Sequence, residues 1–151
     1  MKVISLWQPW ASLVAIDLKH NETRSWYTSY RGPLAIHAAK TLIPFEQLFT
    51  ELSFHQRMFI LDKLCETYGD YNSMPAGAIL ATTNLINAVA TEKILPATDW
   101  LERACGDYSP GRFAWKLYDT KRLEKPIPIK GRQRLWEYDL TEGGIPGVHQ
   151  L

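Results

Sequence analysis

The chain has 151 residues, 46% of them hydrophobic and 22% charged, which is the composition of one ordinary globular domain. This composition excludes a disordered chain. No apolar run approaches the roughly 20 residues that a transmembrane helix needs, so we expect no membrane partner. The net charge of +1 gives no argument for a polyanionic partner.

The N-terminal part of the chain predicts a strand, a short helix and two further strands. Val3 to Leu6 is a short apolar run, and Pro9 suits the start of a helix that reaches about Leu18. Residues 21–26 alternate, which places three side chains on one face of a strand: Glu22, Arg24 and Trp26. Residues 34–38 also alternate between two faces: Leu34, Ile36 and Ala38 on the first, Ala35 and His37 on the second.

The acidic middle of the chain, about residues 44–68, predicts a helical insert. Pro44 begins a first helix with an apolar stripe: Phe45, Leu48, Phe49 and Leu52. Ser53 is a suitable N-cap for a second helix, and Gly69 ends it. The stripe of this second helix would be Phe54, Met58, Leu61, Cys65 and Tyr68. Both stripes are more typical of core packing than of a binding groove.

The second half of the chain predicts the remaining strands. The apolar run from Ala78 to Val89 is long enough for a central strand, and Asp99 caps a short helix ending near Cys105. Residues 113–117 alternate and predict another strand. Pro126 and Pro128 should keep the next segment out of a central sheet position.

The last strand is expected over residues 135–140, and the glycine-rich residues 141–151 are expected to be a flexible tail. The order of the elements predicts an α+β domain, residues 1–140, on a closed or nearly closed sheet.

The sequence also bears on location and cofactors. Lys2 precedes an apolar stretch, but residues 7–10 interrupt it and no cleavage site follows, so we expect a folded N-terminus rather than a signal peptide. Cys65 and Cys105 fit no metal-ligand spacing, and the four histidines are scattered. We therefore expect reduced thiols, no metal, no cofactor and a cytoplasmic location.

Charge is unevenly distributed along the chain. Residues 103–134 carry nine basic and three acidic side chains, whereas residues 46–70 carry five acidic and two basic ones. A basic side of this kind is typical of a nucleic-acid interface. A solvated basic loop without a partner explains the same composition equally well.

One polar cluster is unusual for a core or for a plain surface. Lys19, Glu22, Arg24 and Trp26 follow one another across a turn and along one strand face. Burial of Glu22 and Arg24 would be costly unless they pair, and an indole is an odd end to a solvent-facing row. A cleft wall satisfies both objections, and a structural surface ion pair is the alternative.

Basic residues in three other segments could contact a phosphate or a base edge. His37 and Lys40 follow the third strand, a glycine-flanked loop delivers Arg112, and Arg132 lies in the basic turn 130–134. Cations interleaved with indoles are a usual chemistry for holding unpaired bases, and three indoles lie near these cations: Trp26, Trp115 and Trp136. Structural roles for His37 and Lys40 explain them equally well.

Five sequence blocks occur in order: Ser5–Ala11 (SLWQPWA), Lys19–Trp26 (KxxExRSW), Tyr30–Ala38 (YRGPLAIHA), Gly106–Trp115 (GDYxPGRFAW) and Gly131–Trp136 (GRQxLW). Together they resemble the ASCH domain, the activating signal cointegrator homology domain of the PUA-like superfamily, over about residues 2–140. The resemblance implies a small mixed β-barrel with flanking and inserted helices and a cleft lined by the 19–24 segment. Superfamily members bind RNA, modified bases or DNA, and some ASCH proteins are hydrolases of acylated cytidine or ribonucleases.

The chain departs from the pattern of this family at several positions. Asp17 and Arg134 stand where glycine is common, and they add a carboxylate near Lys19 and a cation beside the cleft. Glu22 replaces the threonine that is the presumed nucleophile of the hydrolase branch. That branch also carries a glutamate on the central strand, where this chain has Thr82, Thr83 and Asn84.

The first functional hypothesis is a module that binds RNA, single-stranded nucleic acid, or a nucleoside or nucleotide. Its candidate ligand-binding residues are Trp7, Lys19, Glu22, Arg24, Trp26, His37, Lys40, Arg112 and Arg132. The alternative is an enzyme, a hydrolase of N4-acylated cytidine or a ribonuclease, with Lys19 as base and Glu22 as acid or base. A third hypothesis is a protein-interaction adaptor that uses the acidic insert. The sequence leaves the oligomeric state open.

Overall fold

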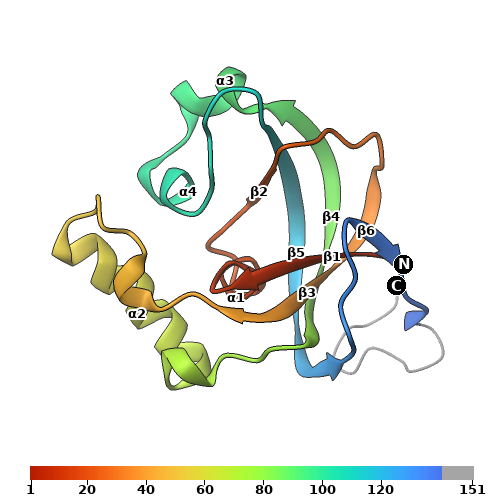
Figure 1. The fold of residues 1–151 in the computed structure, drawn as a ribbon, viewed down its shortest axis with the longest axis horizontal. Helices are drawn as coiled ribbons and strands as arrows, with labels where there is room; N and C mark the ends of the chain where they lie inside the picture. Colours follow the sequence, from red (N-terminus) through yellow and green to blue (C-terminus); the bar gives the residue numbers. More distant parts are fainter. Residues whose placement is uncertain (141–151) are drawn as a thin grey trace.

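A mixed six-stranded sheet organises residues 1–140, the part of the chain that the computed structural model describes (Figure 1). Its strands are β1 (Lys2–Gln8), β2 (Asn21–Arg24), β3 (Gly32–Leu42), β4 (Ala78–Ala90), β5 (Phe113–Pro128) and β6 (Leu135–Glu137). The α-helices are α1 (Trp10–Ala15), α2 (Phe54–Tyr68), α3 (Thr91–Ile94) and α4 (Trp100–Ala104). Three single 3-10 turns accompany them: η1 (Phe45–Gln47), η2 (Tyr71–Ser73) and η3 (Leu95–Ala97).

The strand order β2-β5-β4-β3-β1-β6 confirms the predicted α+β class, and a PUA-like fold fits it. β1 pairs in parallel with β3, and the other pairs are antiparallel. Of the expected closed or nearly closed sheet, full closure is not found, because β2 and β6, the two edges, do not pair with each other within residues 1–140. These edge strands have only four and three residues, so each covers a short part of its one neighbour.

The two faces of the sheet carry different apolar clusters. Ile4 and Ile36 share one face with the buried side of α1 and with Trp115. Val3 and Ala35 lie on the opposite face, which the chain after β5 covers. The predicted alternation of residues 34–38 is therefore confirmed.

The first helix is shorter than predicted. Its residues Ala11–Ala15 are buried, but Asp17 has a left-handed backbone with φ 64°, which ends the helix before Leu18. The amides of Leu18 and Lys19 both donate to the Leu13 carbonyl, at 3.0 and 3.1 Å. This turn directs Lys19 into the protein interior, where its side chain is 1% exposed.

The helical insert differs from the prediction in two ways. Instead of a helix after Pro44 there is only the turn η1, since Phe49 has a left-handed φ of 59° that a helix cannot contain. The side chain of Phe49 still packs in the apolar cluster around α2, as expected for its stripe.

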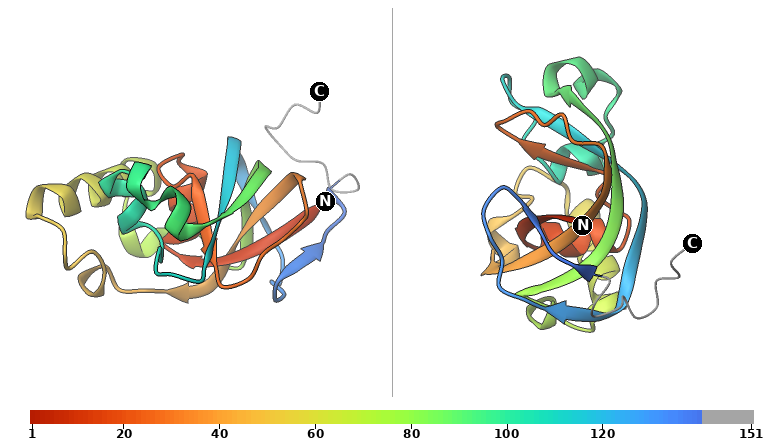
Figure 2. Two further views of the ribbon diagram at one scale, coloured as in Figure 1. Left: turned by 90° about the horizontal axis from the view of Figure 1, so that it is seen from above. Right: turned by 90° about the vertical axis from the view of Figure 1, so that its right-hand side faces the viewer.

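The second helix of the insert, α2, begins and ends as predicted. Ser53 and Gln56 form a capping box, and Gly69 ends the helix with φ 80°. The predicted stripe is confirmed only in part. Leu61 and Tyr68 pack against the apolar cluster, but the fully buried residues of α2 are Ile60 and Leu64, and Phe54 is 69% exposed. The start of α2 projects away from the sheet (Figures 1 and 2), so Phe54 has no layer to pack against.

The C-terminal strands begin where they were predicted, but β5 continues to Pro128 and β6 already ends at Glu137. β4 lies between β3 and β5, and the Asp99 carboxylate accepts a hydrogen bond from the Glu102 amide at 2.9 Å at the start of α4. β2 covers only the first four residues of β5, so Pro126 and Pro128 lie on an edge with no strand partner within residues 1–140. Within residues 1–140, no helix is both long and apolar enough to span a bilayer. The predicted tail, residues 141–151, lies outside the described part.

Candidate functional site

Six of the nine candidate residues line one polar cleft of about 590 Å³. Its walls come from β1, the turn after α1, β2, the 47–51 segment and the loop between α4 and β5. The six candidates are Trp7, Lys19, Glu22, Arg24, Trp26 and Arg112. The structure therefore brings together side chains that the sequence places up to 105 positions apart.

A chain of opposite charges forms the base of this cleft. Glu22 Oε1 lies 3.5 Å from Lys19 Nζ, and Glu22 Oε2 lies 3.0 Å from Arg24 Nη2. Alternation along β2 puts Glu22 and Arg24 on the same face, while the turn after α1 brings Lys19 to them. Two cations thus compensate one carboxylate that is only 8% exposed.

Lys19 and Arg24 have different access to a ligand. Lys19 Nζ donates to the Cys105 carbonyl as well as facing Glu22, so this ammonium holds the site together from inside. Arg24 Nη2 donates to the Ser5 carbonyl at 2.9 Å, and its side chain is 25% exposed. Arg24 therefore presents guanidinium hydrogens to the cleft while two protein groups keep it in place.

The loop before β5 is tied to β2 and carries Arg112. The Asp107 amide donates to Thr23 Oγ1 at 2.9 Å, and Arg112 Nη2 donates to the Thr23 carbonyl at 3.3 Å. Gly106 favours this approach, because a Cβ there would make a tight contact of 3.1 Å with Thr23 Cγ2. Hydrogen bonds from the Ser109 hydroxyl and amide lower the pKa of Asp107, which keeps an anion beside Arg112.

Glu102 is a structural member of the site that the sequence reasoning missed. It is 8% exposed, and its carboxylate accepts hydrogen bonds from the backbone amides of His20 and Asn21. Burial raises the pKa of Glu102, and these amides partly oppose that effect. The sequence shows only the spacing from Asp99 that marks a helix start, which gives no hint that Glu102 fixes the turn after Lys19.

Three candidates lie in a neighbouring cavity rather than in the cleft. His37, Lys40 and Arg132 line a space of about 1060 Å³ between β1, β3 and the chain after β5. Three residues line both spaces, so the two are adjoining: Ser5, Trp7 and Arg24.

His37 has a structural role in this second cavity. Its ring bridges Ser5 Oγ at 3.0 Å and the Ile129 carbonyl at 2.7 Å, and burial lowers its pKa, which favours the neutral ring. The Ile129 carbonyl can only accept, so Nε2 of His37 is the donor and Nδ1 accepts from the Ser5 hydroxyl. Gly131 lies directly over this pair, because a Cβ there would be 2.6 Å from His37 Cε1.

The tryptophans divide into core and surface residues. Trp115 is fully buried and Trp136 is 7% exposed, so the expectation that they hold bases is wrong. Trp26 packs edge-on against Trp115 at 4.7 Å, and the Arg134 guanidinium lies 4.0 Å from its ring centroid. Trp7 is 56% exposed and lines both spaces, which makes it the indole best placed for stacking.

Asp17 and Arg134, which stand where glycine is common in the family, both have a left-handed backbone. Asp17 has φ 64° and Arg134 has φ 60°. The Asp17 carboxylate lies 3.2 Å from His20 Nε2 and is 66% exposed, so it pairs with His20 on the surface. On the central strand, Thr83 donates to the Tyr118 carbonyl at 3.1 Å, and none of residues 82–84 lines either space.

An open mixed sheet with a polar cleft between its short edge strand and a helical end defines a PUA-like α+β domain. The chain belongs to the ASCH domain family, whose pattern it matches over residues 4–127. It is 31% identical over 147 residues to activating signal cointegrator 1 of Homo sapiens and, equally, of Mus musculus. These matches cover 96% of this chain and 24% of each relative, so the chain spans about a quarter of their length.

Solved structures show the same fold. The ASCH protein from Zymomonas mobilis superposes with a TM-score of 0.55 at 14% identity, covering 94% of this chain and 90% of that chain. A point variant of the same protein superposes with a TM-score of 0.56 at 14% identity, covering 91% and 89%. At this identity the likeness concerns the fold alone.

Proposed function

We propose that this ASCH domain binds RNA or another single-stranded nucleic acid, with one nucleotide in the polar cleft. The observation that carries the proposal is the convergence of Arg24 and Arg112 with the exposed ring of Trp7 on one cavity. Guanidinium groups recognise phosphates and base edges in pairs of hydrogen bonds, and an indole offers a stacking face for an unpaired base. The ASCH family is generally associated with RNA binding, which supports the same assignment. A cytoplasmic location remains a prediction.

The cleft also suits a nucleotide in its electrostatics. Glu22 is already neutralised by Lys19 and Arg24, so a further anion in the cleft faces little repulsion from it. An oxygen of Glu22 can still accept from a base amino group, which would add base preference to phosphate affinity. Lys19 acts in this proposal by positioning Glu22, since its side chain is 1% exposed.

Tryptophan fluorescence tests the proposal. Single-stranded RNA and a mononucleotide are titrated into wild type, Trp7→Phe and Trp100→Phe. Trp100 is the matched control, because it is 39% exposed and lines neither space. We expect quenching that falls with salt and is largely lost in Trp7→Phe only. Absence of quenching at millimolar mononucleotide together with absence of salt-dependent RNA binding would refute the proposal.

The close Lys19–Glu22 pair supports hydrolysis of N4-acylated cytidine or of single-stranded RNA as the second candidate function. In it Lys19 would be the base and Glu22 the acid or base, although the contacts of Lys19 with Glu22 and the Cys105 carbonyl favour a positioning role. Wild type and Lys19→Ala are incubated with N4-acylated cytidine and with labelled RNA. Equal product from both proteins would remove Lys19 as the base.

A further inference from the structure

The cavity beside the cleft has an unbalanced charge. Five cations line it: Arg24, Lys40, Lys130, Arg132 and Arg134. Among residues 1–140, no acidic residue lines it. The cleft itself is mixed, with Glu22, Glu51 and Asp107 among its lining residues. The two adjoining spaces therefore differ in the ligand chemistry that they favour.

Three of the five cations have no counter-charge within the part of the chain that the structure describes. Arg24 pairs with Glu22, and Arg134 covers the ring of Trp26. Lys40, Lys130 and Arg132 are exposed and, within residues 1–140, have no ion-pair partner within 4.0 Å. Like charges gathered in one hollow repel one another, so an anion entering it relieves repulsion as well as gaining attraction.

The protein holds the segment that carries Lys130 and Arg132 in a fixed place. Ser5 and His37 are partners in the β1–β3 register, and His37 binds the Ile129 carbonyl at the start of the segment. Gly131 fits over the His37–Ser5 pair only because it lacks a side chain. This close approach of backbone to sheet sets where the segment enters the cavity that Lys130 and Arg132 line.

From these observations we infer that the ligand is a single-stranded oligonucleotide, with its phosphodiester chain continuing from the cleft into this cationic cavity. The inference rests on the proposed function and extends it. Trp7 lies at the junction, where a base can stack while phosphates meet cations on one side and Arg112 on the other. The cavity volume of about 1060 Å³ is at the upper end of small-molecule pockets, which span roughly 300–1,000 Å³. The two spaces together hold more than one nucleotide.

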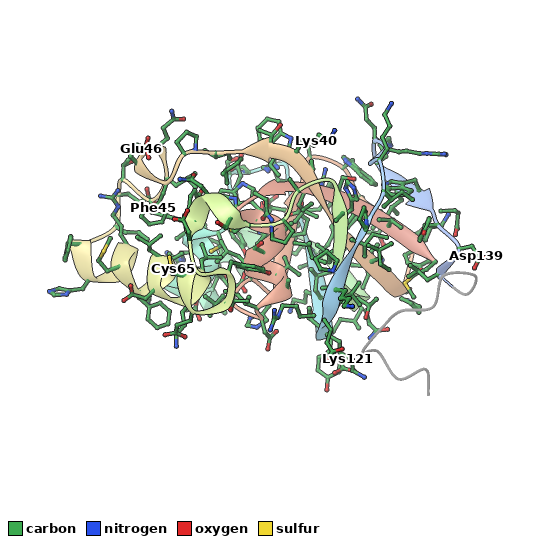
Figure 3. The ribbon with its side chains drawn as sticks, turned by 90° about the horizontal axis from the view of Figure 1, so that it is seen from below. Lys40, Phe45, Glu46, Cys65, Lys121 and Asp139 are labelled. Atoms are coloured by element: carbon green, nitrogen blue, oxygen red, sulfur yellow. The ribbon has the colours of Figure 1, made fainter. Side chains whose placement is uncertain are left out.

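The inference predicts that affinity rises with chain length, and that the cationic cavity is the reason. Affinities for a 5′-mononucleotide and for RNA and DNA oligomers of two, four and eight nucleotides are measured at several salt concentrations. The test variant is Lys40→Ala/Arg132→Ala. The control, Lys121→Ala/Lys125→Ala, removes two exposed cations from β5 outside both spaces, and Lys121 lies far from Lys40 (Figure 3).

We expect wild type and control to bind the octamer much more tightly than the mononucleotide. In the test variant, the ratio of octamer affinity to mononucleotide affinity should be mostly lost. The plot of log affinity against log salt should become less steep by about 1.4 in the test variant, because each of the two lost phosphate contacts contributes about 0.7 on single strands. Comparing the affinities for RNA and DNA oligomers shows whether the site accepts ribose, deoxyribose or both, since the two share the same phosphates.

Two outcomes overturn the inference and spare the proposed function. One is equal affinity of wild type for mononucleotide and octamer. The other is a length ratio in Lys40→Ala/Arg132→Ala that matches the control. If wild type binds neither ligand, the proposed function itself fails.

Discussion

Replacement of Lys19 by methionine isolates the energetic role of the buried ammonium. The side chain is 1% exposed, lies 3.5 Å from Glu22 Oε1 and donates to the Cys105 carbonyl. Methionine keeps most of the volume but leaves the carbonyl without a donor and Glu22 with Arg24 as its remaining partner. Removing one member of a buried pair costs about 3–5 kcal/mol. Because Arg24 still compensates Glu22, we expect a loss near the lower value, about 3 kcal/mol.

Urea unfolding monitored by tryptophan fluorescence measures this loss. Lys63→Met is the matched control, since Lys63 and Glu66 have the same spacing in sequence and lie 3.6 Å apart. Their side chains are 42% and 66% exposed, so we expect this change to cost about 0.5 kcal/mol or less. A shifted midpoint with an unchanged slope would show that stability changed while the surface exposed on unfolding did not. Equal losses in the two variants, or a loss under about 1 kcal/mol for Lys19→Met, would refute the reasoning.

Two further predictions concern backbone strain and pH. Asp17→Gly should stabilise the domain by about 1 kcal/mol because φ 64° is left-handed, whereas Asp17→Ala should not; equal melting temperatures for the two variants would contradict this. Burial lowers the pKa of His37, so the unfolded chain takes up a proton first as pH falls below about 6.5. The free energy of unfolding should then decrease by up to about 1.4 kcal/mol per pH unit until the folded-state pKa is reached. His37→Gln should flatten the urea-derived stability profile between pH 7.5 and 5, and an identical profile would show that His37 is not its source.

Much of the fold was predictable because local patterns and tertiary packing agree. The alternation of residues 34–38, the cap at Ser53 and the helix that Asp99 starts all follow from side-chain period and capping chemistry. The helix expected after Pro44 fails because Phe49 adopts a left-handed backbone that its residue type does not announce. The closed barrel fails because the lengths of β2 and β6 depend on their neighbours rather than on their own sequences.

The sequence predicted which residues form the candidate site better than it predicted how they are arranged in space. The alternation in β2 and the turn after α1 were sufficient to place Lys19, Glu22 and Arg24 together. The division into a mixed cleft and a cationic cavity was not visible, because it depends on where the chain after β5 crosses the sheet. Burial of Trp115 was also hidden, since alternation shows which residues share a face and not which face is covered.

The uncovered edge of β5 has a consequence for how this domain behaves at high concentration. Beyond the four residues that β2 covers, no strand within residues 1–140 pairs with this edge, so its outer backbone can meet another extended chain. Pro126 and Pro128 lack the amide hydrogen that such a chain would need, and the exposed charged side chains of Lys121 and Lys125 oppose burial of this edge against a second strand. A strand this long can therefore stay open without seeding intermolecular sheets or fibrils, and replacing its prolines and lysines together would remove that protection.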